Sequence, residues 1–357
     1  MQTAPEDYMV ESGPGRTVKV KGSDFLFFSG YNYLGVNQDA DFHALLLEGV
    51  SKYGWLFPSS RISNSRLGIF EDCEAFLAEL CGSEESVLLP SGFAAGRMAT
   101  SLYPDLYNAP GSHPAILRNA STFLCFDEWA KWFEGKIGSA SEEMPVCASD
   151  SLNVLKPELY DFSFLKYPQT AVNVVLDDSH GIGLIGKDGK GISSIVPMTG
   201  DVHYLFSYSL SKSFGISGGA VCCSNEEAKA IRTCPEYTAT TPVPPAHLYA
   251  FMNAQEIYAR QRQKLHSNIS FFSDLIKDIE GIRFVPGFPV FVLPASINAF
   301  VFQQENILIS SFAYPDPTGE KLNRIVLNAL HTQSDLEKIA KVLERAANYT
   351  DAIKSNI

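Results

Sequence analysis

The sequence has no long apolar run. None of its stretches approaches the roughly eighteen uncharged apolar residues of a membrane-spanning helix, and the opening residues, MQTAPEDYMVESG, are polar and acidic. These absences argue against membrane insertion and against a secretory leader. We therefore expect a cytoplasmic protein without a membrane partner.

Basic residues are also scarce. Lysine and arginine total 28 against 40 aspartates and glutamates, which gives a formal net charge of −12, and no lysine-rich or arginine-rich run offsets this balance. Nucleic-acid binding depends on cationic side chains that neutralise phosphates, so the composition argues against a nucleic-acid partner.

Cysteines are few and irregularly spaced. The seven cysteines are odd in number and form no CxxC pair. This spacing argues against a zinc ribbon and against a disulfide framework, and it favours small core residues in a reducing compartment. We expect no bound metal. Internal repeats and low-complexity tracts are lacking as well.

What the chain does contain is enough apolar material for a large core. Its 357 residues are 45% hydrophobic and 19% charged, which predicts a globular protein of two lobes. We expect an N-terminal segment over residues 1–42, a large domain over 43–255 and a small C-terminal domain over 256–357.

Apolar periodicity predicts the main elements of these parts. Before the middle of the chain it predicts strands over 17–20 and 25–28 and helices over 41–53, 69–80 and within FDEWAKWFEG. In the last third it predicts one long helix over 246–279, strands over 282–285, 298–302 and 324–327, and a closing helix over 334–347.

The most distinctive stretch is SYSLSKSFGISGGAVCCS, residues 207–224, with Lys212 at its centre. Apolar runs over 202–206 and 220–223 enclose hydroxyl side chains, one lysine and several glycines, which predicts a strand, a tight loop and a second strand. An amine among hydroxyl donors suits pyridoxal phosphate, because the amine condenses with the aldehyde and the hydroxyls bind the phosphate. A surface lysine in a serine-rich hairpin is the alternative.

A second signal is TAVNVVLDDSHGIGLIGKDGKG, which begins at Thr170. Residues 172–176 predict a buried parallel strand, and Asp177, Asp178 and His180 follow at its carboxyl end, where open α/β sheets bind ligands. A buried carboxylate there can keep the pyridine nitrogen of pyridoxal phosphate protonated. An aspartate pair that caps a turn is the alternative.

The GIGLIG segment matches the GxGxxG pattern of nicotinamide-dinucleotide sites. That fingerprint requires its glycines directly after the strand and at the start of a helix. Here DDSH intervenes, and the following KDGKGISSIVP is too rich in glycine and proline for that helix. We therefore reject a dinucleotide site.

A third signal is SVLLPSGFAAGRMATSLY, which begins at Ser86. A strand ends at Leu89, and a helix opens near Gly92 and Phe93. Free backbone N–H groups and the positive end of the helix dipole meet there, which suits a phosphate, although a plain strand–helix turn has the same pattern. His113 follows just beyond a turn, and a single histidine is more often structural than catalytic.

Together these motifs resemble the α-oxoamine synthases, a family of pyridoxal-phosphate-dependent fold-type I enzymes. The similarity runs from YNYLG at Tyr31 to the closing helix, and is strongest in LDDSHGIGLIGKDGKG, SYSLSKSFGISGGAV, TTPVPPA and RIVLNALHTQSDL. It implies an α/β, aspartate-aminotransferase-like fold, with a mostly parallel central sheet in the large domain and a small α+β C-terminal domain.

The resemblance also implies roles for individual residues. Lys212 matches the lysine that binds the cofactor covalently, Asp177 the partner of the pyridine nitrogen, and His180 the histidine near the ring hydroxyl. His113 matches the histidine that stacks on the cofactor ring. The remaining matches are Ser209, Gly92 and Phe93 for the phosphate, Thr241 for the phosphate of a neighbouring subunit, and Arg324 for the carboxylate of the amino acid.

The implied reaction is an acyl transfer. An amino acid, alanine, condenses with an acyl thioester, a pimeloyl one, with loss of carbon dioxide, as in biotin biosynthesis, and the shared phosphate site implies a homodimer. The alternatives are another fold-type I reaction, either glycine C-acyl transfer or transamination, and a catalytically silent pyridoxal-fold protein that binds cofactor or partners.

The chain also departs from the family pattern. The stretch between Gly92 and Asp177 is shorter than in typical members. Where many relatives carry a serine near the ring hydroxyl, this chain has Asn153 or Val154. These departures concern the part of the site that would recognise the acyl thioester.

Overall fold

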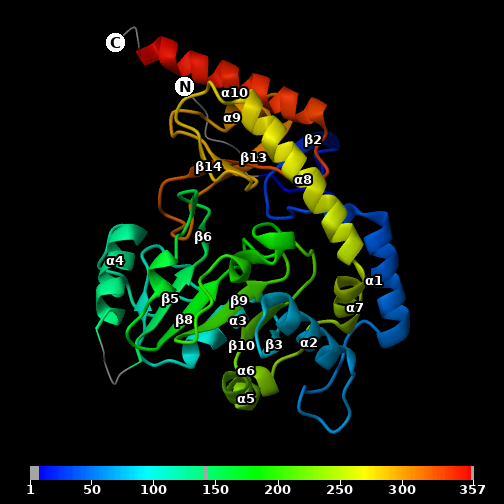
Figure 1. Cartoon of the computed structure of the whole chain (residues 1–357). Helices are drawn as coiled ribbons and strands as arrows, with labels where there is room; N and C mark the ends of the chain where they lie inside the picture. The colour runs from blue at the N-terminus through cyan, green and yellow to red at the C-terminus, as the bar shows by residue number, and fades with distance from the viewer. Residues whose placement is uncertain (1–7, 140–143, 355–357) are drawn as a thin grey trace. The chain divides into compact units, whose positions relative to one another are not determined.

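The computed structural model describes residues 8–139 and 144–354. It divides the chain into two compact units, shown by element in Figure 1. The large unit comprises Ala44–Asn153 and Leu159–Gln255, and the small unit comprises Met1–His43, Val154–Glu158 and Glu256–Ile357. The roles expected for the two domains stay a prediction.

A six-stranded sheet forms the centre of the large unit. Its strand order is β3-β10-β9-β8-β5-β4, and only β10 runs antiparallel to its neighbours. The strands are β3 (Glu85–Leu89), β4 (Tyr107–Asn108), β5 (Val146–Asp150), β8 (Val172–Asp177), β9 (Val202–Ser209) and β10 (Gly219–Cys223). Five strands therefore point their carboxyl ends to one edge of the sheet.

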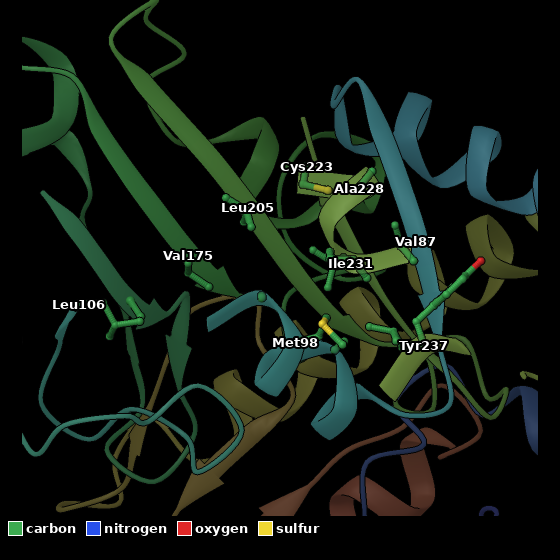
Figure 2. Close-up of a cluster of buried hydrophobic side chains, with 14 of the residues drawn as sticks. Val87, Met98, Leu106, Val175, Leu205, Cys223, Ala228, Ile231 and Tyr237 are labelled. Atoms are coloured by element: carbon green, nitrogen blue, oxygen red, sulfur yellow. The ribbon is translucent and has the colours of Figure 1, made fainter. Parts of the chain in front are cut away.

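Helices cover both faces of this sheet. On one face, α3 (Gly92–Ser101) packs against β9 and β10, and α5 (Asn225–Thr233) packs near β3. Figure 2 shows the apolar cluster between them, to which β3 contributes Val87, β9 Leu205 and β8 Val175. On the other face, the Cys222 Sγ atom lies 3.7 Å from the carbonyl oxygen of Leu77 in α2 (Ile69–Cys81).

Local signals in the sequence explain where these helices begin and end. Ser91 caps α3 by accepting the N–H of Ala94, and Ser224 forms a capping box with Glu227 at the start of α5. Helix α2 ends at Gly82, whose positive φ of 70° suits a residue without a Cβ. The other α-helices of this unit among the described residues are α1 (Ala40–Tyr53), which begins in the small unit, α4 (Phe126–Ile137), α6 (Pro235–Thr238) and α7 (Pro245–Asn253).

A second six-stranded sheet organises the small unit, in the order β1-β2-β13-β14-β12-β11. Its strands are β1 (Thr17–Val20), β2 (Ser23–Phe28), β11 (Arg283–Phe284), β12 (Val290–Val292), β13 (Ile307–Phe312) and β14 (Leu322–Val326). Helices α8 (Gln255–Leu275) and α10 (Gln333–Lys354) are its longest helices among the described residues. Apolar residues of β1, β2 and β13 form a small core there.

Two of the predicted elements are wrong. The segment predicted as a strand over 298–302 is a turn followed by the short helix α9 (Phe300–Gln303). The helix predicted over 246–279 is two helices, α7 and α8, which are interrupted at Ala254 (φ −94°, ψ 16°), and α8 ends at Leu275. Short apolar runs do not distinguish a buried helical turn from a strand, which explains the first error.

Among the residues that the structure describes, no helix is long and apolar enough to cross a membrane.

We expect that shortening a side chain in the apolar cluster beside α3 lowers the free energy of unfolding substantially. Leu205 is fully buried in it, so Leu205→Ala should lower the free energy of unfolding by about 2–5 kcal/mol through lost burial and a residual cavity. Leu124 is 87% exposed, and Leu124→Ala should change that free energy by less than about 0.5 kcal/mol. Urea unfolding of both variants would measure this, and equal effects would contradict the assigned core.

Candidate active site

A row of three polar side chains lies at the carboxyl edge of the sheet in the large unit. Ser207 of β9 pairs with Asp177 of β8, and Asp177 pairs with Asp150 of β5. Paired residues of adjacent strands point to the same face, which here is the face that α3 covers. Two residues earlier on each strand, the same face carries the apolar Leu205, Val175 and Ala148.

Lys212 lies in the loop between β9 and β10, beside this row. The loop is closed by a hydrogen bond of 3.0 Å from the Leu210 N–H to the Gly218 carbonyl. Burial lowers the pKa of the Lys212 amine, whereas nearby carboxylates, that of Asp177 foremost, oppose that shift. An amine in these surroundings loses its proton more readily than a surface lysine does.

Backbone segments approach one another closely at both ends of the β9–β10 loop that carries Lys212. A Cβ at Gly92 would lie 2.4 Å from the Ser209 Cβ, and a Cβ at Gly219 would lie 2.3 Å from the Ser91 carbonyl oxygen. Both positions therefore require glycine. The first-turn N–H groups of α3, at Gly92 and Phe93, have no acceptor within the helix by geometry, so they suit an anion.

The hydroxyls of this region are arranged around β9. Ser209 Oγ lies 2.9 Å from Ser211 Oγ, and the Ser179 Oγ accepts the Ser209 N–H at 2.8 Å. Ser207 Oγ is buried without a hydrogen-bond partner among the described residues. A buried hydroxyl of this kind fits a site that a polar ligand completes.

Asp178 points away from this row and holds the following loop. Its carboxylate accepts a hydrogen bond from Ser151 Oγ and another, of 2.8 Å, from the Ile192 N–H. A Cβ at Gly181 or at Gly191 would lie 2.0 Å from its carboxylate oxygens. The glycines of GIGLIGKDGKG thus allow the loop to close around Asp178, and no helix follows them in the manner of a dinucleotide site.

His113 lies at the same edge, in the turn after β4. Its backbone N–H donates to the Asp150 Oδ2 atom at 2.8 Å, and its Nδ1 accepts the Ala115 N–H at 3.1 Å. Burial lowers the pKa of His113, while the charge of Asp177 raises it and that of Lys212 lowers it further. The structure therefore brings together His113, Asp177, Lys212 and the close backbone approach of Gly92 and Ser209.

Other predicted residues lie further along the chain. His180 is partly buried in the turn after β8, and Thr241 is exposed in the segment before α7. Asn153, one of the two residues expected at the position of the family's serine, donates to the Tyr160 hydroxyl at 3.0 Å. Val154 belongs to the small unit.

Arg324 belongs to β14 of the small unit and is 1% exposed. Its guanidinium carbon lies 5.2 Å from the centre of the Phe312 ring, but Nε and Nη1 have no hydrogen-bond partner among the described residues. A buried cation is costly unless an anion pairs with it, so these two donors fit a bound carboxylate.

Sequence reasoning missed Asp150. It ends the strand segment VCAS in the same way that Asp177 ends VNVVL, and the rule that the carboxyl ends of parallel strands share one edge was available to find it.

Among the described residues, no group of histidines, cysteines, aspartates and glutamates is arranged to hold a metal ion.

Comparison with known proteins gives this arrangement a context. Residues 166–343, about half of the chain, match the family model of the class I and II aminotransferases. The 8-amino-7-oxononanoate synthase of Buchnera aphidicola is 24% identical over 92% of this chain and 91% of its own length, and the serine palmitoyltransferase of Bacteriovorax stolpii is 23% identical over 96% and 87%. Another relative, the biotin biosynthesis bifunctional protein BioWF of Corynebacterium kroppenstedtii, is 24% identical, and this chain spans 54% of its length.

Solved structures show the same fold. The serine palmitoyltransferase of Sphingomonas wittichii has a TM-score of 0.80 at 18% identity, covering 97% of this chain and 93% of that chain. The 8-amino-7-oxononanoate synthase of Francisella tularensis has a TM-score of 0.73 at 19% identity, covering 91% and 98%. The prediction of a fold-type I architecture is confirmed.

The close contact at Gly92 predicts a cost for any larger side chain. Gly92→Ala must separate α3 from β9 near Ser209, so it should lower the free energy of unfolding by about 1–3 kcal/mol. Gly135, in α4, has no atom within 4 Å of an added Cβ, and Gly135→Ala should be neutral or stabilising by up to about 1 kcal/mol. Denaturant unfolding distinguishes the two, and a stable Gly92→Ala variant would contradict the contact.

The raised pKa of Asp178 leads us to expect that the stability of the protein depends on pH. Burial raises its pKa to about 7, against the opposing hydrogen bonds from Ser151 and Ile192. The native carboxyl therefore keeps a proton that the unfolded chain releases near pH 4, so its contribution to stability is complete below that pH and is lost as the pH rises through about 7.

Relative to Asp178→Asn, the wild-type protein should thus lose up to a few kcal/mol of stability between about pH 4 and pH 8. Urea unfolding across this range measures the difference. Asp105→Asn, which changes an exposed aspartate of the same unit, should leave the pH profile unchanged. Parallel profiles for wild type and Asp178→Asn would refute a protonated Asp178.

Proposed function

We propose that this chain, which belongs to the class I and II aminotransferase family and is a pyridoxal-phosphate-dependent enzyme of the α-oxoamine synthase type, condenses L-alanine with a pimeloyl thioester and releases carbon dioxide. The product would be 8-amino-7-oxononanoate, in biotin biosynthesis. The relatives that carry the name 8-amino-7-oxononanoate synthase over more than nine-tenths of this chain support that choice of substrates.

One observation carries the proposal. The buried Lys212 amine shares the sheet edge with Asp177, and the glycine-lined seat at Gly92 and Ser209 lies beside them. Amine, carboxylate and anion seat are the three groups that pyridoxal phosphate requires of a protein, namely for its aldehyde, its ring nitrogen and its phosphate. The residues present therefore fit this cofactor.

Pyridoxal phosphate, when bound, supplies an electron sink for negative charge at the α-carbon of an amino acid. Lys212 would bind the cofactor and, once displaced by the amino acid, would take the α-proton on its Nζ atom. Burial lowers the pKa of this amine, which favours the neutral form that a base requires.

The other residues would orient the reacting groups. The carboxylate of Asp177 would hold the proton of the ring nitrogen, His180 would lie near the ring hydroxyl, and His113 would stack on the ring. The first-turn N–H groups of Gly92 and Phe93, together with Ser209, would bind the phosphate.

Substrate and subunit contacts complete the proposal. Arg324 would bind the carboxylate of the amino acid through the unpartnered Nε and Nη1 atoms. Thr241, exposed in this chain, would reach the phosphate in a second copy, so that a homodimer forms the complete site. A cytoplasmic location accords with the substrates.

A second candidate has support from the comparisons. Serine palmitoyltransferases match this chain at about the same identity as the oxononanoate synthases, and their structures reach TM-scores of 0.80–0.81. The amino acid could thus be serine and the thioester a long-chain one. Glycine C-acyl transfer, transamination and a silent cofactor-binding protein are further outcomes that one assay separates.

The purified protein should take up pyridoxal phosphate and release free coenzyme A and carbon dioxide from alanine with pimeloyl-CoA. Serine with palmitoyl-CoA, and glycine with short acyl thioesters, test the alternatives. A keto acid without free coenzyme A would instead indicate transamination, and no turnover or α-proton exchange with any amino acid would indicate a silent protein.

Lys212→Ala is the control for the same assay, since it should abolish turnover. Borohydride reduction of the wild-type protein followed by peptide mapping should place the cofactor on Lys212. Label on any other lysine, or a protein that takes up no pyridoxal phosphate, would refute the proposed site.

A further inference from the structure

Asp150 is a partly buried acid at the sheet edge that the roles above do not use. It ends β5 and pairs directly with Asp177, the last residue of β8. An ionised Asp150 would raise the pKa of Lys212, so the two side chains lie close enough to interact. Two carboxyls and one amine therefore share a small region at the carboxyl edge of the sheet.

The contacts of Asp150 connect it to His113. The Asp150 Oδ2 atom accepts the His113 N–H at 2.8 Å, which ties the turn after β4 to the end of β5. The same turn is joined to β5 by a hydrogen bond of 2.8 Å from the Ala109 N–H to the Ala148 carbonyl. The His113 backbone is thus held at the sheet edge by the side chain of Asp150, which belongs to β5, the strand beside β8.

The side chain of His113 is oriented by the turn itself. Its Nδ1 accepts the Ala115 N–H at 3.1 Å, so in the neutral ring the proton lies on Nε2. A Cβ at Gly96 of α3 would lie 2.8 Å from the Ala115 Cβ, so α3 packs tightly against this turn. The Asp150 anchor, by contrast, comes from a titratable group.

Burial and the neighbouring charges determine whether the Asp150 carboxyl keeps its proton. Burial is the main cause that raises the pKa of Asp150 well above its usual range, and the charge of Asp177 raises it further. The His113 N–H and the charge of Lys212 oppose the shift without cancelling it. Two adjacent carboxyls do not both ionise at low cost, so one of the pair keeps its proton.

We propose that Asp150 is a positioning residue of this site, which in its neutral form anchors the turn that carries His113 and leaves the negative charge of the pair on Asp177. The inference rests on the proposed binding of pyridoxal phosphate at Lys212. A neutral acid there serves the site in two ways: it accepts the His113 N–H, and it adds no second charge beside the carboxylate that would meet the ring nitrogen.

The test compares two substitutions of Asp150. Asp150→Asn keeps the shape and an acceptor oxygen without a charge, so it should bind pyridoxal phosphate within about twofold of wild type and keep the pH profile of the bound cofactor's visible absorbance. Asp150→Ala removes the anchor and should weaken cofactor binding about tenfold, the scale of one lost hydrogen bond at a buried group. Asp105→Asn serves as the matched surface control.

Two results would overturn the proposal. If Asp150→Asn binds the cofactor as weakly as Asp150→Ala, the charge of Asp150 is required, and the acid is not neutral. If Asp150→Ala binds it as tightly as wild type, the anchor has no role. Thermal unfolding of each variant verifies that it is folded before its affinity is interpreted.

A second measurement separates this proposal from the cofactor assignment. In the cofactor-free full chain, the imidazole NMR signal of His113, assigned by a His113→Gln variant, should shift in Asp150→Ala and stay near its wild-type position in Asp150→Asn. That pattern supports the anchor even if wild type binds no pyridoxal phosphate, in which case the proposed function alone fails. A signal that shifts in both variants, or in neither, overturns the anchor.

Discussion

The site depends on placing one amine among acidic side chains at the edge of a sheet. Lys212 is partly removed from water, which disfavours its charged form, while the nearby carboxylate of Asp177 favours it. The opposing effects leave an amine whose proton is held less firmly than that of a solvated lysine. Reactivity at this position is therefore a consequence of burial, and burial is supplied by the sheet and by the loop from Leu210 to Gly218.

Glycines make this burial possible. At Gly92 and Gly219 the start of α3, the end of β9 and the start of β10 approach one another more closely than any side chain would allow. At Gly181 and Gly191 the loop after β8 closes on the carboxylate of Asp178. The glycines of GIGLIG match the spacing of a dinucleotide fingerprint. In this chain, glycine in the loop after β8 is required because the backbone closes on the buried Asp178 side chain.

Most of the large unit was predictable from local patterns. The strands that end at Leu89 and Asp177, the helix that opens at Gly92 and the loop around Lys212 all lie where periodicity and turn residues place them. The small unit was less predictable: residues 298–302 form a turn and a helical turn, whereas β12 and β13 were not anticipated. Such short apolar segments have no period of their own, and tertiary packing decides their conformation.

Local patterns in the sequence are sufficient to predict which side chains stand at the ends of strands, because alternation of apolar residues and the turn residues after them are local properties. Lys212, Asp177 and the Gly92 turn are of this kind. The position of β5 beside β8, through which Asp150 pairs with Asp177 and holds His113, becomes visible in the folded chain alone. Strand order and register depend on contacts between residues far apart in the chain, and no local pattern specifies them.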